Sequence, residues 1–169
     1  MTAAVADARN QAEPSYQKGP DGPPLLEETI GANLERMAAR FPENDALVEY
    51  ATGKRWTYAE FDAEVNRIAR GLLGSGIGKG DRLGIWAPNR SEWTLVQYAT
   101  AKIGVILVNI NPSYRSHELA YALNHSGCSV VISSPAFKSS DYRAMLTEVA
   151  PQCPSLTNII YLGNRVGMT

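Results

Sequence analysis

The chain has 169 residues, of which 44% are hydrophobic and 20% are charged, an ordinary composition for one globular domain. Sixteen Lys and Arg residues against seventeen Asp and Glu give a formal net charge of -1, which shows no electrostatic footprint for nucleic acid. The longest strongly apolar stretch, residues 103–110, is far shorter than the roughly 20 residues of a membrane-spanning helix, and two cysteines cannot form a disulfide framework.

Residues 1–24 are rich in proline and glycine and carry scattered charges. They lack the basic segment followed by an apolar segment that is typical of a secretory signal peptide. We therefore predict a flexible tail over residues 1–24 and a folded unit over residues 25–169. The free thiols expected at Cys128 and Cys153 favour a reducing compartment and a cytoplasmic location.

A helix and a hairpin are predicted at the start of the folded unit. Apolar residues at helical spacing run from Ile30 to Phe41, and Pro42 ends the pattern. Two β-prone runs, residues 46–50 and 55–57, flank a glycine-containing turn, which is typical of a β-hairpin.

Thr57 and Glu60 have the spacing of a capping box, which predicts that a second helix begins there and continues to a glycine-rich segment. Residues 76–81 of that segment look like a phosphate-binding loop. They follow a helix and precede a strand, whereas a phosphate loop follows the strand and opens the helix. We therefore interpret residues 76–81 as a structural turn.

Four apolar runs alternate with three helical patterns between Asp81 and Leu162. The strands are expected at residues 82–87, 105–110, 129–133 and 158–162, and the helices near residues 93–103, 119–123 and 142–149. Continuous apolar runs indicate strands that are buried on both faces. The predicted fold class is therefore α/β, a parallel sheet with alternating helices preceded by a helix, a hairpin and a second helix.

No residue pattern identifies a catalytic or metal site. His117 and His125 are eight positions apart with no carboxylate or cysteine at ligand spacing, and no Gly-x-Ser-x-Gly nucleophile motif occurs. The three tryptophans fall at element boundaries or on apolar faces, where core packing is expected. The residues by themselves thus predict a fold without an active site.

Several segments nevertheless follow one another in an order that is typical of a known family. They are Trp56-Thr57-Tyr58-Ala59-Glu60-Phe61, the run from Gly78 to Asn89, Glu92-Trp93, and the run from Ala101 to Pro112. This series resembles the core of the adenylate-forming superfamily of acyl-CoA synthetases, adenylation domains and luciferases. The later segments, Asn111-Pro112-Ser113-Tyr114-Arg115, Glu118-Leu119 and Ser126-Gly127, are similar to its fatty-acyl-CoA ligase branch. The resemblance covers about residues 25–163.

The resemblance implies an AMP-forming ligase that works in two steps. A carboxylate attacks the α-phosphate of ATP and releases pyrophosphate, and the thiol of coenzyme A then displaces AMP from the acyl-adenylate. Mg²⁺ and cationic side chains would offset the charge on the phosphates. A fatty acid is the expected carboxylic acid.

Much of the machinery of that superfamily has no matching position in this sequence. The phosphate loop ending in Pro-Lys-Gly, the adenine-binding segment, the metal-binding Glu and the lid with its catalytic Lys are all unmatched. We therefore expect the chain to be the N-terminal portion of such an enzyme, an incomplete adenylating domain that carries no catalytic residue and is inactive by itself.

The resemblance also implies a coenzyme A site at the carboxyl end of the sheet, where ligands of parallel sheets bind. Two loops, residues 111–115 and 134–138, are expected to leave neighbouring strands there. Lys138 is the first choice for a phosphate of coenzyme A and Arg115 the second, with loop backbone against the adenine. The candidate residues are Asn111, Pro112, Ser113, Arg115 and Lys138. As an alternative, both cations are solvated and Arg115 steadies the next helix through a local carboxylate.

Other functions stay open at this point. The parent could be an aryl-CoA ligase, or a fatty-acyl-AMP ligase that passes the acyl group to a carrier protein. The chain could also be a non-catalytic scaffold, or a flavodoxin-like binding module. The last of these favours a Ser/Thr/Gly-rich loop after the first parallel strand, where this sequence has Ala87-Pro88-Asn89.

A homodimer is a further expectation. The resemblance implies that the hairpin of residues 46–57 belongs to a sheet completed by strands from later in the parent enzyme. In the isolated chain the hairpin edge and the side chains of Leu47 and Trp56 would then lack partners, which favours self-association.

Overall fold

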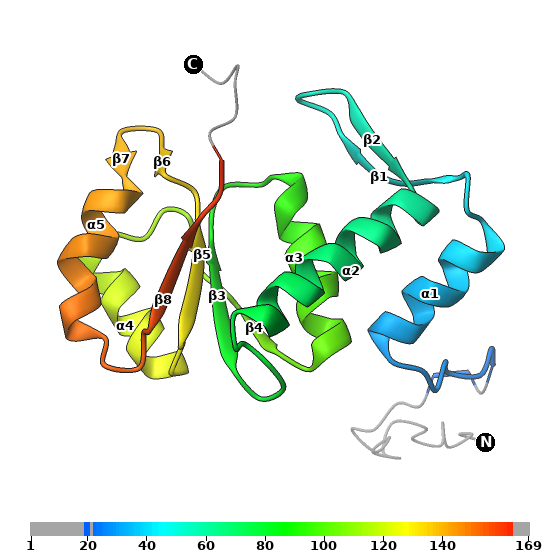
Figure 1. Cartoon of the computed structure of the whole chain (residues 1–169), viewed down its shortest axis with the longest axis horizontal. Coiled ribbons are helices and arrows are strands. Elements are labelled where there is room, and N and C mark those ends of the chain that lie inside the picture. Colours follow the sequence, from blue (N-terminus) through cyan, green and yellow to red (C-terminus); the bar gives the residue numbers. More distant parts are fainter. Residues whose placement is uncertain (1–18, 21, 164–169) are drawn as a thin grey trace, which may run out of the picture.

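A four-stranded parallel sheet forms the centre of the molecule (Figure 1), with strand order β4-β3-β5-β8. The strands are β3 (Arg82–Trp86), β4 (Ile106–Asn109), β5 (Val130–Ser133) and β8 (Asn158–Tyr161). This computed structural model describes residues 19–20 and 22–163, so the tail predicted over residues 1–24 lies almost entirely outside the described residues. The predicted α/β fold with a parallel sheet is confirmed.

Helices cover both faces of the sheet. They are α2 (Tyr58–Gly74) and α3 (Ser91–Ile103) on one face, and α4 (Ser116–Ser126) and α5 (Tyr142–Val149) on the other (Figure 1). Two apolar clusters fill the layers between, one built with Leu72 and Val96, the other with Leu119 and Leu146. The chain thus leaves β3 and β5 toward opposite faces, which makes their carboxyl ends a topological switch point.

The prediction that all four strands are buried on both faces is wrong for the outer two. The central strand β5 is buried along its whole length, and β3 is buried from its second residue. On β4 the side chain of Ile106 is 48% exposed, and on β8 that of Ile160 is 36% exposed. Within the described residues each of these apolar strands has one hydrogen-bonded neighbour, so its other side is less covered than that of a central strand.

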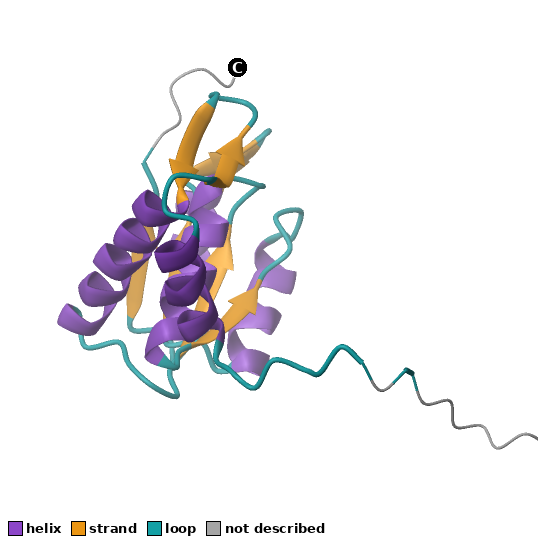
Figure 2. Cartoon of the chain, turned by 90° about the vertical axis from the view of Figure 1, so that its right-hand side faces the viewer, coloured by secondary structure: helices purple, strands orange, loops and turns teal. Residues whose placement is uncertain are grey.

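The N-terminal half follows its local sequence signals. Helix α1 (Ile30–Arg40) is capped by Thr29, and the hairpin consists of β1 (Asp45–Glu49) and β2 (Lys54–Thr57). Thr57 and Glu60 form the predicted capping box at the start of α2. Figure 2 shows the loop that precedes α1 extending away from the body of the protein.

The expectation that Leu47 and Trp56 lack partners in this chain is wrong. Leu47 is half-buried and packs against the same apolar cluster as Trp56. The side chain of Trp56 is only 7% exposed and packs in a cluster with Leu34 and Phe61, because the hairpin folds back onto α1 and α2. The large hydrophobic residues that the hairpin exposes are instead Val48 and Tyr50. The hairpin is therefore anchored within the chain by its tryptophan.

The glycine-rich segment between α2 and β3 is the predicted helix-to-strand turn. Gly76 and Gly80 adopt positive φ angles of 80° and 92°, which favour glycine. The carboxylate of Asp81 accepts a hydrogen bond of 2.8 Å from the backbone N–H of Gly78. The turn is therefore closed by its own residues.

Lys102 joins the three N-terminal helices. Its ammonium group on α3 donates hydrogen bonds to Glu35 of α1, at 2.8 Å, and to Asp62 of α2, at 2.7 Å, and a third to Asn66. Burial by itself lowers the pKa of this ammonium, but the bonds to Asp62 and Glu35 outweigh burial and raise the pKa above its ordinary value. Gly31 leaves room for the lysine, since a Cβ there would lie 2.9 Å from Cγ of Lys102.

Two short elements escaped the sequence analysis. Strands β6 (Ala136–Phe137) and β7 (Ser140–Asp141) form a small hairpin between β5 and α5, where a plain loop was expected. A 3-10 turn, η1 (Ala150–Gln152), follows α5. Strands of two residues carry too little periodicity to be detected from sequence.

Candidate functional site

Three loops meet at the carboxyl end of the sheet, after β3, β4 and β5. The expectation that the coenzyme A loops leave neighbouring strands is wrong, because β3 lies between β4 and β5. The loops still come together, since side chains from β3 and α5 reach the loop after β4. This region is called the carboxyl-edge site below and comprises residues 111–115 and 134–142.

A stacked aromatic pair supports the loop after β4. The rings of Trp86 and Tyr142 lie 3.6 Å apart between centroids and are inclined by 10°. Nε1 of Trp86 donates to the carbonyl oxygen of Asn111 at 3.0 Å, and the hydroxyl of Tyr142 donates to the carbonyl oxygen of Pro112. The buried side chains of Trp86 and Tyr142 thus fix the carbonyl groups of two successive loop residues, Asn111 and Pro112.

Burial also keeps the Tyr142 hydroxyl protonated. It raises the pKa of Tyr142 to about 12, although the charge of Arg115 acts in the opposite direction. The hydroxyl therefore remains a donor to Pro112 throughout the physiological range. The sequence marked Trp86 as a core residue and Tyr142 as a helix start, and no local signal showed that the two rings stack.

The backbone of the loop is further ordered by its own side chain. Oδ1 of Asn111 accepts a hydrogen bond of 2.9 Å from the N–H of Ser113, the pattern of an Asx turn. Asn111 and Ser113 are exposed and Pro112 is half-buried. The loop therefore presents a preformed backbone surface to solvent beside the switch point.

Arg115 connects the two candidate loops. Its guanidinium donates a hydrogen bond of 2.8 Å to the hydroxyl of Ser140 on β7. Glu118 accepts from the backbone N–H of Arg115 at 2.8 Å, so the local carboxylate steadies the start of α4 through the main chain and not through the guanidinium. The alternative role that the sequence suggested for Arg115 is thus fulfilled by its backbone.

Lys138 occupies the tip of the small hairpin. It is exposed and has a φ of 52°, a left-handed conformation that is uncommon for a residue with a side chain. Its ammonium lies 5.2 Å from the centroid of the Phe137 ring. Among residues 22–163 it has no carboxylate partner, so the cation is available to a ligand.

A buried arginine lies at the topological switch point, where the carboxyl ends of β3 and β5 meet. The side chain of Arg90 is 6% exposed and forms a two-pronged ion pair with Glu92, at 2.6 and 2.8 Å. It also donates to Ser134 after β5, at 3.2 Å, and to the carbonyl of Gly163 after β8, at 3.3 Å. The sequence analysis did not single out Arg90, because its partners lie 44 and 73 residues away.

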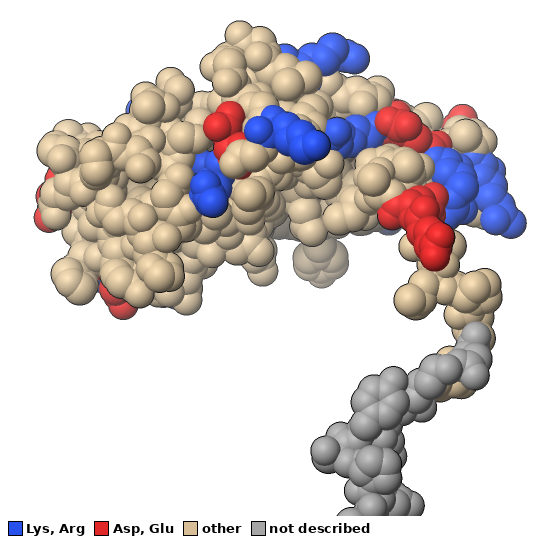
Figure 3. Space-filling view, turned by 90° about the horizontal axis from the view of Figure 1, so that it is seen from below, with Lys and Arg blue, Asp and Glu red and all other residues tan. Residues whose placement is uncertain are grey.

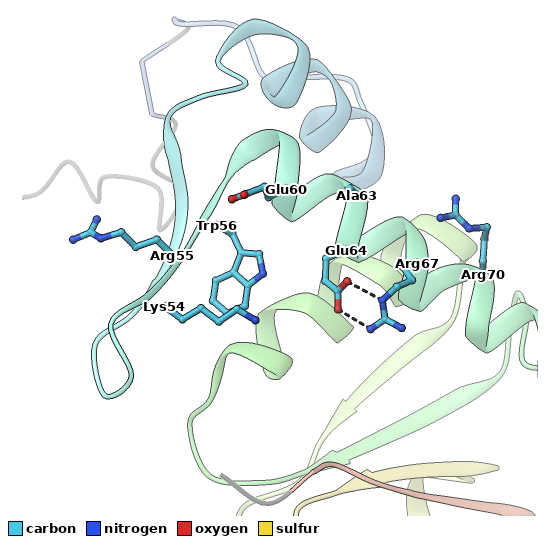
Figure 4. Close-up of a pocket in the computed structure, with 8 residues that line it drawn as sticks. All are labelled: Lys54, Arg55, Trp56, Glu60, Ala63, Glu64, Arg67 and Arg70. Carbon is cyan, nitrogen blue, oxygen red and sulfur yellow. Dashed lines mark hydrogen bonds and ion pairs between the residues drawn. The ribbon is translucent and has the colours of Figure 1, made fainter. Parts of the chain in front are cut away.

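A second group of cations surrounds an open groove of about 500 Å³ between β2 and α2 (Figure 4). Its arginines are largely neutralised, because Arg67 is paired with Glu64 at 2.7 Å and Arg55 with Asp45. Lys54 lies over the Trp56 ring at 4.2 Å. Figure 3 likewise shows basic and acidic side chains interspersed on the face seen there. The groove is therefore a solvated surface on which basic and acidic side chains are mixed.

Within residues 19–20 and 22–163, no group of three or more His, Cys, Asp or Glu side chains could hold a metal ion. In the same part of the chain, no helix is long and apolar enough to cross a membrane.

Residues 34–166 match the AMP-binding enzyme family. The mitochondrial medium-chain acyl-CoA ligase ACSF2 of Macaca fascicularis is 43% identical over 138 residues, which are 82% of this chain and 22% of that protein. The putative acyl-CoA synthetase YngI of Bacillus subtilis (strain 168) is 39% identical in an alignment of 154 positions that covers 83% of this chain and 28% of that protein. The chain therefore spans less than a third of the length of these two relatives.

A solved structure agrees with the sequence matches. The inhibitor-bound N-terminal domain of FACL13 from Mycobacterium tuberculosis has a TM-score of 0.72 at 31% identity, and the match covers 79% of this chain and 33% of that one. A long-chain-fatty-acid-CoA ligase from Archaeoglobus fulgidus, with a TM-score of 0.76 at 21% identity over 91% of this chain and 31% of that one, shares the fold. The chain belongs to the AMP-binding enzyme family.

Proposed function

We propose that this chain is the N-terminal part of an ATP-dependent, AMP-forming ligase that joins a fatty acid to coenzyme A. The membership of the AMP-binding enzyme family carries the proposal. The names of the similar ligases from macaque and Bacillus subtilis support a carboxylic acid and coenzyme A as substrates. The strand order alone is also compatible with a flavodoxin-like binding module. The family match argues against that alternative.

The proposed reaction has two steps. The carboxylate oxygen attacks the α-phosphorus of ATP, the bond to the β-phosphate oxygen breaks, and pyrophosphate leaves. The thiol of coenzyme A then loses its proton and attacks the acyl carbonyl, so that AMP leaves with the electrons of the broken carbon–oxygen bond. Mg²⁺ would offset the charge of the phosphates in the first step, and we assign no residue of this part of the enzyme to it.

In this proposal the carboxyl-edge site binds the nucleotide end of coenzyme A. The backbone of Pro112 and Ser113 lies against the adenine, and Asn111 holds that backbone in shape. Lys138 meets a phosphate, since it is exposed and unpaired, and Arg115 is the second cation within the same loop pair. A charge-assisted hydrogen bond of this kind contributes about 1.5–3 kcal/mol.

An activity assay separates the chain from its parent. We expect the isolated 169-residue chain to give no carboxylate-dependent ATP–pyrophosphate exchange, because the phosphate loop and the lid lysine have no matching positions in it. We expect the longer enzyme to exchange pyrophosphate with a fatty acid and to form a thioester with coenzyme A. Exchange by the isolated chain would contradict its assignment as an inactive portion.

The alternative functions differ in the carboxylic acid that is activated and in the molecule that accepts the acyl group. An aryl-CoA ligase would show exchange with aromatic acids, and a fatty-acyl-AMP ligase would form the adenylate without transferring the acyl group to coenzyme A. A scaffold would show neither activity in the longest natural product of the gene. Comparing these substrates in one exchange and transfer assay distinguishes all four functions.

A cytoplasmic location and a homodimer also belong to this proposal. Both cysteines are free and buried, which fits a reducing compartment, although the similar ACSF2 is named a mitochondrial protein. Cell fractionation of the natural host tests the location. Self-association is supported by the two edge strands of the sheet, which have one hydrogen-bonded neighbour each within the described residues.

A further inference from the structure

Two helices that begin at the carboxyl edge of the sheet start with an arginine. The N-cap residue of α3 is Arg90, and that of α4 is Arg115. Ser, Thr, Asp and Asn are preferred at this position, because their oxygens accept from the N–H groups of the first helical turn. A guanidinium group has no acceptor, and its charge lies beside the positive end of the helix dipole. Both arginines therefore occupy positions that helix formation by itself does not favour.

Helices α1, α2 and α5 follow the usual preference. Thr29 caps α1, Thr57 caps α2 and Asp141 caps α5, each through a side-chain oxygen. The two arginines thus occur at the helices that follow β3 and β4, on the side of the sheet where the loop with Lys138 lies. Residues that break a local rule are expected at functional sites, where another requirement outweighs the preference of the helix.

Each arginine bonds to one end of the segment between β5 and α5. This segment, residues 134–141, is called the β6–β7 loop below. Arg90 donates to the hydroxyl of Ser134, the first residue of the loop, at 3.2 Å. Arg115 donates to the hydroxyl of Ser140, near the end of the loop, at 2.8 Å. The β6–β7 loop is thus joined at its beginning to the start of α3 and near its end to the start of α4.

The bond at Ser140 reaches Lys138 through the small hairpin. Ser140 on β7 pairs directly with Phe137 on β6. Lys138 follows Phe137 in the chain, and its ammonium lies 5.2 Å from the centroid of the Phe137 ring. The hydrogen bond from Arg115 to Ser140 therefore restricts where the ammonium of Lys138 can lie.

The bond at Ser134 lies in the protein interior. Ser134 is 2% exposed, and its N–H donates to the carbonyl oxygen of Trp86 at the end of β3, at 3.1 Å. The guanidinium of Arg90 is in turn oriented by its ion pair with Glu92 in the first turn of α3. The beginning of the β6–β7 loop is therefore fixed both to the strand and to the helix that meet at the switch point.

We propose that Arg90 and Arg115 are positioning residues for coenzyme A. They hold the β6–β7 loop so that Lys138 meets a phosphate of coenzyme A, and neither arginine contacts the coenzyme itself. This inference rests on the proposed function of the carboxyl-edge site. It gives Arg115 a role within the protein, whereas the sequence made Arg115 the second choice for the phosphate. Arg115 and Ser140 then act as one unit, because their bond joins the loops after β4 and β5.

Serine variants test the inference without removing a cation. In the longer enzyme, Ser140→Ala and Ser134→Ala should each raise the KM for coenzyme A about threefold or more, because the β6–β7 loop loses one of its two bonds to the arginines. The KM for the fatty acid, measured by ATP–pyrophosphate exchange in the same preparation, reports on the rest of the enzyme. Ser155→Ala, at an exposed serine outside the site, is the matched control. If Arg115 were a phosphate ligand, Ser140→Ala would leave the KM for coenzyme A unchanged or lower it, since the cation would remain.

A double-mutant cycle separates positioning from direct binding. The KM for coenzyme A of the Arg115→Met, Ser140→Ala double variant should exceed that of Arg115→Met by less than about twofold, because both substitutions remove the same bond. Additive effects, or a raised KM in Arg115→Met with none in Ser140→Ala, would overturn the proposal. So would an unchanged KM in both serine variants of an enzyme that forms the thioester. If the unaltered enzyme forms no thioester with coenzyme A, the proposed function fails, and this inference fails with it.

Discussion

Two lysines in this chain show how differently one residue type can be used. Lys102 has an 8% exposed side chain and three hydrogen-bond acceptors from two other helices. Lys138 lies at the exposed tip of a two-strand hairpin, and within the described part of the chain it contacts the Phe137 ring and no carboxylate. The ammonium of Lys102 stabilises the packing of three helices, whereas the ammonium of Lys138 is available to bind a ligand. A structural lysine and a ligand-binding lysine thus differ in solvent exposure and in hydrogen-bond partners, and both properties depend on the tertiary structure.

The largest expected effect tests the structural side of this comparison. Lys102→Met removes the ammonium, so Asp62 loses its cationic partner and keeps only the bond from Asn66, while Oδ1 of Asn66 loses its donor; the free energy of unfolding should fall by about 2–4 kcal/mol. Urea denaturation of the 169-residue chain measures the change. Lys138→Met is the matched control and should change stability by less than about 0.5 kcal/mol. Equal effects of the two substitutions would remove the distinction.

The next effect tests the binding side. In the longer enzyme, Lys138→Glu should raise the KM for coenzyme A about tenfold, while carboxylate-dependent ATP–pyrophosphate exchange stays near that of the unaltered enzyme. The reason is that the substitution replaces an available cation with a charge that repels phosphate. Lys54→Glu, at another exposed lysine, serves as the control. An unchanged KM for coenzyme A in Lys138→Glu would exclude Lys138 from the site.

A smaller effect tests the support of the carboxyl-edge site. Tyr142→Phe removes the donor to the carbonyl of Pro112 and should lower the free energy of unfolding by about 0.5–1.5 kcal/mol at neutral pH. The stacked ring remains, so the helix and the core should be preserved. Thermal denaturation measures the loss, and an unchanged melting temperature would mean that water replaces the hydroxyl at no cost.

The same substitution has a pH signature. The folded-state pKa of Tyr142 is about 12 and the ordinary value is 10, so folding favours the neutral phenol. The stabilisation from this group is therefore complete below pH 10 and is lost as the pH rises toward 12. Tyr142→Phe should show a shallower decline of stability between pH 10 and 12 than the unaltered chain. Parallel curves would indicate that Tyr142 ionises normally.

The smallest effect concerns the contact between the two loops. Ser140→Ala removes the hydroxyl that accepts from Arg115, and since this contact is exposed, stability should change by no more than about 0.5 kcal/mol. Any change should appear in nuclear magnetic resonance as faster motion of residues 136–141. Ser113→Ala is the control, because its side chain is not used to join the loops.

Local sequence rules determined the elements of this protein. The capping pair of Thr57 and Glu60 sets the start of α2, and glycines with φ of 72° and 65° end α3 and α4 at Gly104 and Gly127. Apolar runs located the four parallel strands, because a short continuous apolar run between turn residues is typical of a strand in a parallel sheet. The order of motifs pointed to the adenylate-forming enzymes, and the comparisons confirmed that family.

Only the tertiary structure decided which segments are neighbours. The sequence could not show that β3 separates β4 from β5, since strand order depends on the faces to which the crossover helices pack. The stacking of Trp86 on Tyr142 and the bond from Arg90 to Ser134 join residues 56 and 44 positions apart, beyond any local pattern. For the same reason, the apolar sequence of β4 could not reveal that, among the described residues, β4 has a strand on one side only. A buried strand and an edge strand have the same local preferences and differ only in what packs beside them.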